Sequence, residues 1–197
     1  KASEENGISK FILIDANLGY SAVSVAPYAT FNKAFVLFVN NANSNQIASL
    51  LKKKGKEVLL YGRLERKAQE ALSPLNFEAI NTGDEYQDNL KIISRFLEQQ
   101  PTKQIIFTNG EILEKSFFNA EFPVLLIGTD AAPEQTLDFL QDSSITTAVV
   151  IGYDLFSNAK KIKDITGIKI LLKYGQGRNS ELYALDIINL AIKKGEF

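Results

Sequence analysis

The chain has 197 residues, of which 45% are hydrophobic, and a formal net charge of -1. This composition supports a folded protein with a substantial core, and a charge so near neutrality gives no general attraction to nucleic acid or to an anionic membrane. Cysteine and histidine are both absent, which excludes disulfides, the usual zinc sites and histidine-dependent catalysis, so we expect no cofactor and no metal ion.

Long apolar runs are missing from the sequence. Uninterrupted apolar runs reach only about six residues, whereas a membrane helix needs roughly 20, so we expect no membrane span. No N-terminal signal is visible and the first residue is Lys1 rather than methionine, which indicates a processed or excised piece of a protein. A cysteine-free sequence is compatible with an extracellular location.

The first half of the chain alternates short apolar runs with helical patterns. Residues 18–31 place Ala22, Val25 and Ala29 on one helical face, and Pro27 within this stretch predicts a break or kink. The predicted elements are strand 11–14, helix 18–31, strand 35–39, helix 44–54, strand 57–61, helix 63–72, strand 77–80 and helix 81–100.

The second half repeats this series, with a shorter helix after its first strand. Because strands that read as continuous apolar runs alternate with helices, we predict an α/β fold with a mostly parallel sheet and helices on both faces. The predicted elements are strand 104–107, helix 110–119, strand 123–127, helix 133–141, strand 146–151, helix 155–164, strand 168–173 and a closing helix at 178–194.

An internal repeat organises the sequence. Residues 34–62 and 122–152 share the order strand, polar loop, helix, strand and glycine. We infer two α/β units, at 1–101 and 102–197, and the lack of a Gly-, Ser- or Pro-rich linker between them predicts that they pack together. The aligned pairs include Val36 with Val124, Ile47 with Leu137, Gly62 with Gly152 and Leu64 with Leu155.

Several segments, taken in order, carry a likeness to a known family. Residues 123–126, Pro-Val-Leu-Leu, are similar to its Pro-Ile-Leu-Leu segment, and residues 35–38, Phe-Val-Leu-Phe, are a weaker version. Residues 21–29, SAVSVAPYA, look like its Asp-Ala-Leu-x-Ala-x-Pro-Leu-Ala helix, and 60–62 and 150–152 look like its strand that ends in glycine. Over nearly its whole length the chain resembles the cell wall-binding repeat type 2 family.

The Arg-Ile-x-Gly-x-x-Arg-Tyr-x-Thr signature of that family is matched loosely. The first unit keeps Gly83, with Tyr86 at the arginine position and Asn89 at the threonine position, and the second keeps Gly175 and Arg178. The resemblance implies tandem duplicated Rossmann-like units, here two repeats and the start of a third. It also implies a non-catalytic cell-surface module that attaches a protein to an anionic envelope polymer or glycan.

Several kinds of position are candidates for ligand binding. Loops that follow parallel strands commonly bind ligands, although Asn and Ser there also act as turn and cap residues. A lysine- and arginine-rich stretch suits a polyanion, although lysines also favour helix ends. The resemblance makes Pro123 part of the polymer site, although its apolar segment is more typical of a buried central strand. The candidates are Lys52, Lys53, Lys54, Lys56, Arg63, Arg66, Asn41, Asn43, Thr129, Asp130, Pro123 and Arg178.

Other functions stay open. A two-lobed protein would bind a small ligand between its units, or would use Asp15 and Asp130 as the acid/base pair of a hydrolase. Residues 175–180 open a helix after a strand but lack the third glycine of a dinucleotide fingerprint. A structural domain that forms homo-oligomers in a surface layer (S-layer) is a further alternative.

Overall fold

The computed structural model describes residues 9–54, 57–111, 115–118, 120–129, 131–174 and 181–183, and its strands form two sheets, one from each half of the chain. The strands are β1 (Lys10–Asp15), β2 (Phe35–Val39), β3 (Glu57–Tyr61), β4 (Glu78–Ile80), β5 (Gln104–Thr108), β6 (Val124–Leu126), β7 (Thr147–Ile151), β8 (Lys169–Tyr174) and β9 (Glu181–Tyr183). The helices are α2 (Gly19–Phe31), α3 (Ser44–Lys54), α4 (Arg66–Leu72), α5 (Glu85–Gln99), α6 (Glu134–Asp142) and α7 (Phe156–Thr166), with 3-10 turns η1 (Lys115–Phe118) and η2 (Tyr153–Leu155).

The two sheets have the same strand order. The first sheet runs β2-β1-β3-β4, and the second runs β6-β5-β7-β8, with β9 added antiparallel to β8. All other neighbours are parallel, which confirms the predicted α/β fold of tandem Rossmann-like units. Val36 pairs with Ile12 in the first sheet and Val124 pairs with Ile106 in the second, so residues that align in sequence occupy matching positions.

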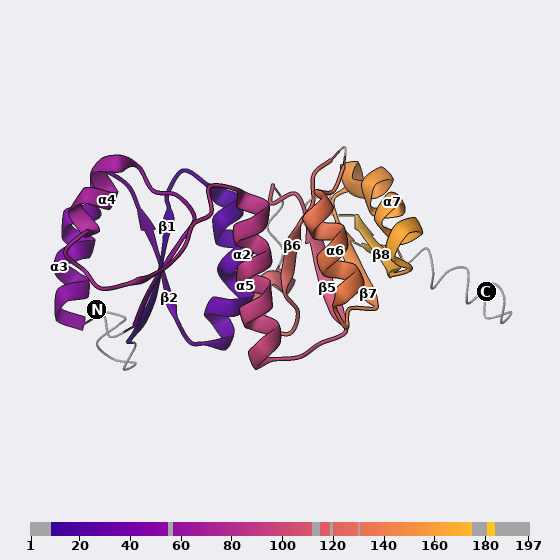
Figure 1. Cartoon of the computed structure of the whole chain (residues 1–197), viewed down its shortest axis with the longest axis horizontal. Helices are drawn as coiled ribbons and strands as arrows, with labels where there is room; N and C mark the ends of the chain where they lie inside the picture. Colours follow the sequence, from indigo (N-terminus) through magenta and orange to yellow (C-terminus); the bar gives the residue numbers. More distant parts are fainter. Residues whose placement is uncertain are drawn as a thin grey trace, which may run out of the picture.

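Helices α2 and α5 lie between the two sheets (Figure 1). In the first sheet, α3 and α4 cover the face that carries Phe11 and Leu13, whereas α2 and α5 cover the face that carries Ile12 and Ile14. In the second sheet, α6 and α7 cover one face with help from Ile93 of α5, and α2 and η1 cover the other. One helical layer therefore serves both cores.

Helix α2 contacts both sheets because it is apolar nearly all round, as a fully buried helix must be. Val25 and Ala29 pack on the first sheet, whereas Val23 and Ala26 pack on the second. The predicted break at Pro27 is wrong, since the helix continues through it for a further turn. A proline inside a helix costs about 3 kcal/mol, and burial of α2 between two cores offsets that cost.

Two other predicted helices differ in the structure. The helix expected at 110–119 is replaced, among the described residues of that range, by the short turn η1, because α2 of the first half already covers the neighbouring face of β6. The closing helix expected at 178–194 is wrong for residues 181–183, which form β9 and continue the hydrogen bonding of β8. The rest of that range lies outside the described residues.

Candidate functional site

A small cavity lies at the carboxyl ends of β1, β3 and β4. In the first sheet, β2 lies on one side of β1, whereas β3 and β4 lie on the other, so the strand order reverses between β1 and β3. Open α/β sheets commonly bind ligands at such a switch point. The cavity has a volume of about 180 Å³. Its polar lining includes Tyr20, Tyr61, Arg63, Asn81, Glu85 and Asp88.

The two tyrosines of this cavity are hydrogen-bonding groups rather than bases. Burial, together with the neighbouring carboxylate of Glu85, raises the pKa of Tyr20 to about 12. Burial also raises the pKa of Tyr61. Both hydroxyls are therefore protonated at neutral pH. The lining contains two carboxylates, those of Glu85 and Asp88, and one guanidinium, that of Arg63. The excess of negative charge makes the cavity unfavourable for an anion.

Asn41 and Asn43 hold the loop between β2 and α3. The Asn43 side chain accepts from the backbone N–H of Asn40 at 2.9 Å and donates to the carbonyl of Phe38 at 2.8 Å. The Asn41 side chain accepts from the N–H of Ala68, in the first turn of α4, at 3.1 Å. The Asn43 side chain thus ties the start of α3 to the end of β2, and the Asn41 side chain caps the first turn of α4.

The basic stretch of the sequence is divided by the fold. Lys52 and Lys53 are exposed in the last turn of α3, beside the amino end of β3, whereas Arg63 and Arg66 follow the carboxyl end of β3. The five residues of β3, at about 3.3 Å each, separate the two groups by roughly 16 Å. The stretch therefore forms two basic positions rather than one cluster.

In the second half, Thr129 is exposed after β6, whereas Pro123 is buried immediately before it. Pro123 lies beside Pro27 of α2 and Phe96 of α5, so it belongs to the contact between the halves and not to an open surface. Four further predictions, together with the glycine-rich residues 175–180, lie outside the described residues: Lys56, Asp130, Arg178 and the side chain of Lys54.

Asp15, the other member of the suggested acid/base pair, is a buried turn residue. Its Oδ1 accepts from the N–H of Asn17 at 2.7 Å at the end of β1. Within the part of the chain that the structure describes, no group of three or more acidic side chains is arranged to hold a metal ion, and no helix has the length and apolarity to cross a membrane.

Sequence reasoning missed the role of Asn89, which lies on α5 and is fully buried. Its amide nitrogen donates to the carbonyl of Val124 at 2.9 Å, and its amide oxygen accepts from the N–H of Leu126 at 2.8 Å. A single side chain thus satisfies two backbone groups of β6, the edge strand of the second sheet. The only signal in the sequence was its place at the threonine position of the family signature.

Two tyrosines of the first half also contact glycines of the second. A side chain on Gly110 would place its Cβ only 2.7 Å from the Cβ of Tyr20, and one on Gly128 would lie 3.5 Å from the hydroxyl of Tyr86. The starts of α2 and α5 therefore approach the loops after β5 and β6 closely. The absence of a side chain at Gly110 allows the approach of Tyr20, whereas 3.5 Å at Gly128 is an ordinary contact distance.

Strand order, register and the shared helical layer define the chain as a tandem α/β protein. Neither a family model nor a curated protein sequence matches it. Its fold is similar to that of two solved cell wall proteins from Clostridium difficile, Cwp6 (20% identity, TM-score 0.65) and Cwp8 (17% identity, TM-score 0.66). Both matches cover 89% of this chain, but only 29% of Cwp6 and 33% of Cwp8, so the chain spans about a third of each protein.

Proposed function

We propose that the chain is a non-catalytic module that attaches a protein to an anionic polymer of the cell envelope and acts at the cell surface. The observation that carries the proposal is the fold, which is similar to those of Cwp6 and Cwp8 over 89% of the chain. The absence of histidine and cysteine from the sequence supports binding rather than catalysis.

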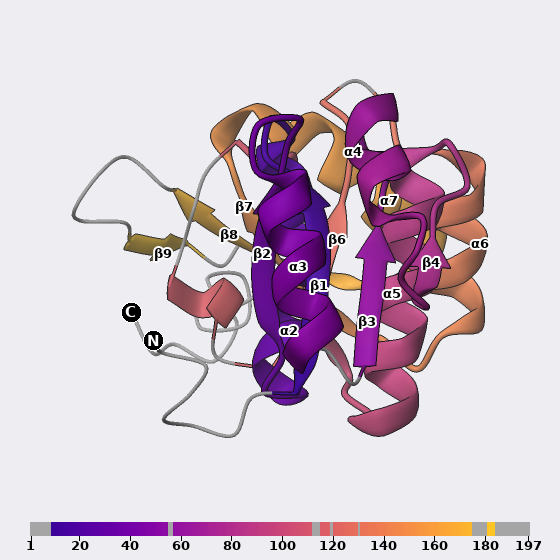
Figure 2. The ribbon, with the colours of Figure 1, turned by 90° about the vertical axis from the view of Figure 1, so that its left-hand side faces the viewer.

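We place the polymer on the outer face of α3 and α4, which is turned toward the viewer in Figure 2. Lys52 and Lys53 of α3 are exposed, as are Arg66 and Lys67 of α4. Helix α3 carries no acidic residue, and Glu70 of α4 is paired with Arg66 at 2.9 Å. The lysines of α3 therefore keep a local positive charge that an anion would meet.

The spacing of these groups suits an extended ligand. Helices α3 and α4 pack against each other, and the basic residues lie at the two ends of that pair. The nine residue-to-residue steps from Ser44 to Lys53 rise about 14 Å along the helix axis at roughly 1.5 Å each. A polymer with several negative charges reaches both ends, whereas a single small anion reaches one.

Co-sedimentation of the chain with protein-stripped envelope tests the proposal. Binding should fall steeply between about 0.05 M and about 0.5 M salt because exposed charge pairs are screened. The variant Lys52→Gln/Lys53→Gln should bind about fivefold more weakly at low salt, since two exposed contacts contribute about 1 kcal/mol together.

The matched control is Lys91→Gln/Lys103→Gln, which removes the same charge from exposed lysines away from the α3/α4 face. This control should bind like the parent chain. Binding that resists salt would contradict the proposal. Equal weakening by both variants would exclude the α3/α4 face as the polymer-binding surface.

A further inference from the structure

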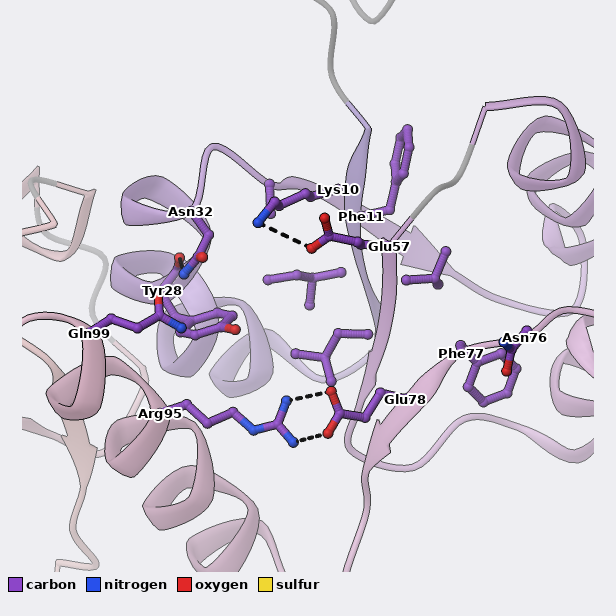
Figure 3. A pocket seen from close by; sticks show the side chains of 14 residues that line it. Lys10, Phe11, Tyr28, Asn32, Glu57, Asn76, Phe77, Glu78, Arg95 and Gln99 are labelled. Carbon is purple, nitrogen blue, oxygen red and sulfur yellow. Dashed lines mark hydrogen bonds and ion pairs between the residues drawn. The ribbon is translucent and has the colours of Figure 1, made fainter.

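A second and larger cavity lies at the opposite end of the first sheet. It has a volume of about 530 Å³, within the usual range for small-molecule sites, and it opens at the amino ends of β1, β3 and β4 (Figure 3). The ends of α2 and α5 form one wall, through Tyr28 of α2, Asn32 directly after it, and Arg95 and Gln99 of α5. This cavity shares no lining residue with the one at the carboxyl ends.

Two ion pairs fix the charged groups of the cavity. Arg95 forms a two-pronged pair with Glu78, in which its Nη1 donates to Oε2 at 2.9 Å and its Nη2 donates to Oε1. These hydrogen bonds from Arg95 hold the pKa of Glu78 below its ordinary value. On the other side, Lys10 Nζ lies 3.1 Å from Glu57 Oε2.

The lining as a whole is electrically balanced. Its two cations, Lys10 and Arg95, each lie against a carboxylate, that of Glu57 or Glu78. An anionic ligand would have to compete with a carboxylate for a cation that is already paired. A cationic ligand would have to compete with Lys10 or Arg95 for a carboxylate that is already paired. The balance therefore favours a ligand with no net charge.

The remaining lining suits a ligand with many hydroxyl groups. The amides of Asn76 and Gln99 offer both donors and acceptors, and the phenol of Tyr28 offers one of each. The amide nitrogen of Asn32 donates one hydrogen to the carbonyl of Tyr28 at 3.1 Å, which leaves its second N–H and its oxygen. Apolar side chains, such as Ile12 of β1 and Leu59 of β3, line the cavity between these polar groups. An apolar floor with a rim of mixed donors and acceptors matches the apolar faces and hydroxyl edges of a sugar ring.

We propose that this cavity binds a neutral sugar unit, a hexose or an N-acetylhexosamine. The site differs from the proposed polymer surface in both place and charge, because it lies at the ends of α2 and α5 rather than on α3 and α4. The two proposals therefore rest on separate residues, and either is testable without the other.

Titration of the isotopically labelled chain, followed by NMR, tests the sugar site. The probes are a panel of neutral hexoses and N-acetylhexosamines, with the uronic acid that corresponds to each hexose. At least one neutral sugar should shift backbone amides of residues such as Asn32, Asn76 and Gln99 in a saturable way. The corresponding uronic acid should bind at least about tenfold more weakly, a difference of about 1.4 kcal/mol.

Two matched variants test the charge balance directly. Glu78→Gln removes one carboxylate from the cavity, so the affinity for the uronic acid relative to its hexose should rise by about fivefold or more. Glu98→Gln makes the same change at an exposed position of α5 outside the lining and should leave that ratio unaltered. Gln99→Ala, at an exposed position, should weaken sugar binding without loss of folding.

The proposal is overturned if no sugar of the panel shifts the amides of the cavity, or if the shifted amides lie elsewhere. It is also overturned if a uronic acid binds as tightly as its hexose, or if Glu78→Gln and Glu98→Gln change the ratio equally.

Discussion

Strands β2 and β6 occupy the same position in the two sheets but differ in their surroundings. All three residues of β6 are buried, with Asn89 of α5 bonded to its edge. In β2, by contrast, Phe35 and Phe38 are 40% and 51% exposed. The two strands have similar apolar sequences, so the difference comes from the neighbouring half of the molecule, which covers β6. The burial of a repeated strand is therefore decided by its neighbour.

The largest effect should follow removal of the amide that bonds to β6. Asn89→Ala leaves the N–H of Leu126 and the carbonyl of Val124 buried without a partner, and we expect a loss of about 4 kcal/mol of unfolding free energy. Urea denaturation measures this loss. Ser94→Ala, on the same helix, removes only a bond within α5 and should cost less than about 0.5 kcal/mol. Equal costs would show that the edge contact contributes little.

The approach of Tyr20 to Gly110 should give the next largest effect. Gly110 has φ 83°, and a Cβ there would lie 2.7 Å from the Cβ and 3.1 Å from the Cα of Tyr20, so Gly110→Ala should cost about 3 kcal/mol. Gly83 has a similar φ of 85° with nothing near it, and Gly83→Ala should cost about 1 kcal/mol. Thermal unfolding of the two variants separates the clash from the backbone strain.

Corresponding positions of the two strands provide a direct test of the comparison. Leu126 of β6 is 3% exposed, so Leu126→Ala should cost about 3 kcal/mol. Phe38 of β2, at the aligned position, should tolerate the change to alanine with a loss below about 1 kcal/mol. Similar losses for both variants, measured by urea denaturation, would mean that β2 is covered in solution.

The smallest effect concerns the ion pair of Glu78 with Arg95. The folded pKa of Glu78 lies below its ordinary value of 4.5, so the pair stabilises the protein at neutral pH and this contribution disappears as the pH falls through that value and below it. Glu78→Gln should lower Tm by less than about 2 °C at pH 7, because Glu78 is largely exposed. The difference should shrink as the pH falls below 4.5 and vanish once the pH lies below the folded pKa of Glu78, and a difference that stays constant over this range would exclude the carboxylate as its cause.

Much of the fold could be predicted from local sequence. Strand 35–39, helix 44–54 and strand 57–61 match β2, α3 and β3 at both ends. Their clear apolar periodicity is bounded by the loop residue Asn43 and by Gly62, which has a positive φ. The helix at 110–119 could not be excluded in the same way. Its place on the second sheet is taken by α2, and nothing within residues 110–119 encodes that competition.

The sites were less predictable than the fold. Asn43 is recognisable from sequence as a turn residue before a helix, but the bonds from Asn89 to β6 join residues 35 and 37 positions apart. The pair of Glu78 with Arg95 likewise depends on how β4 and α5 pack. The lysine-rich stretch is one feature in the sequence because it is continuous in the chain, whereas β3 separates its two parts by the length of the strand.

The position of α2 has a consequence for how this protein evolves. Ala29 touches one core and Ala26 the other, so a larger side chain at either place would disturb a different sheet of the same molecule. Compensating changes would then have to arise far away in the sequence, in whichever half lost its fit. Although the halves share a common architecture, their sequences are therefore expected to vary together rather than as independent copies.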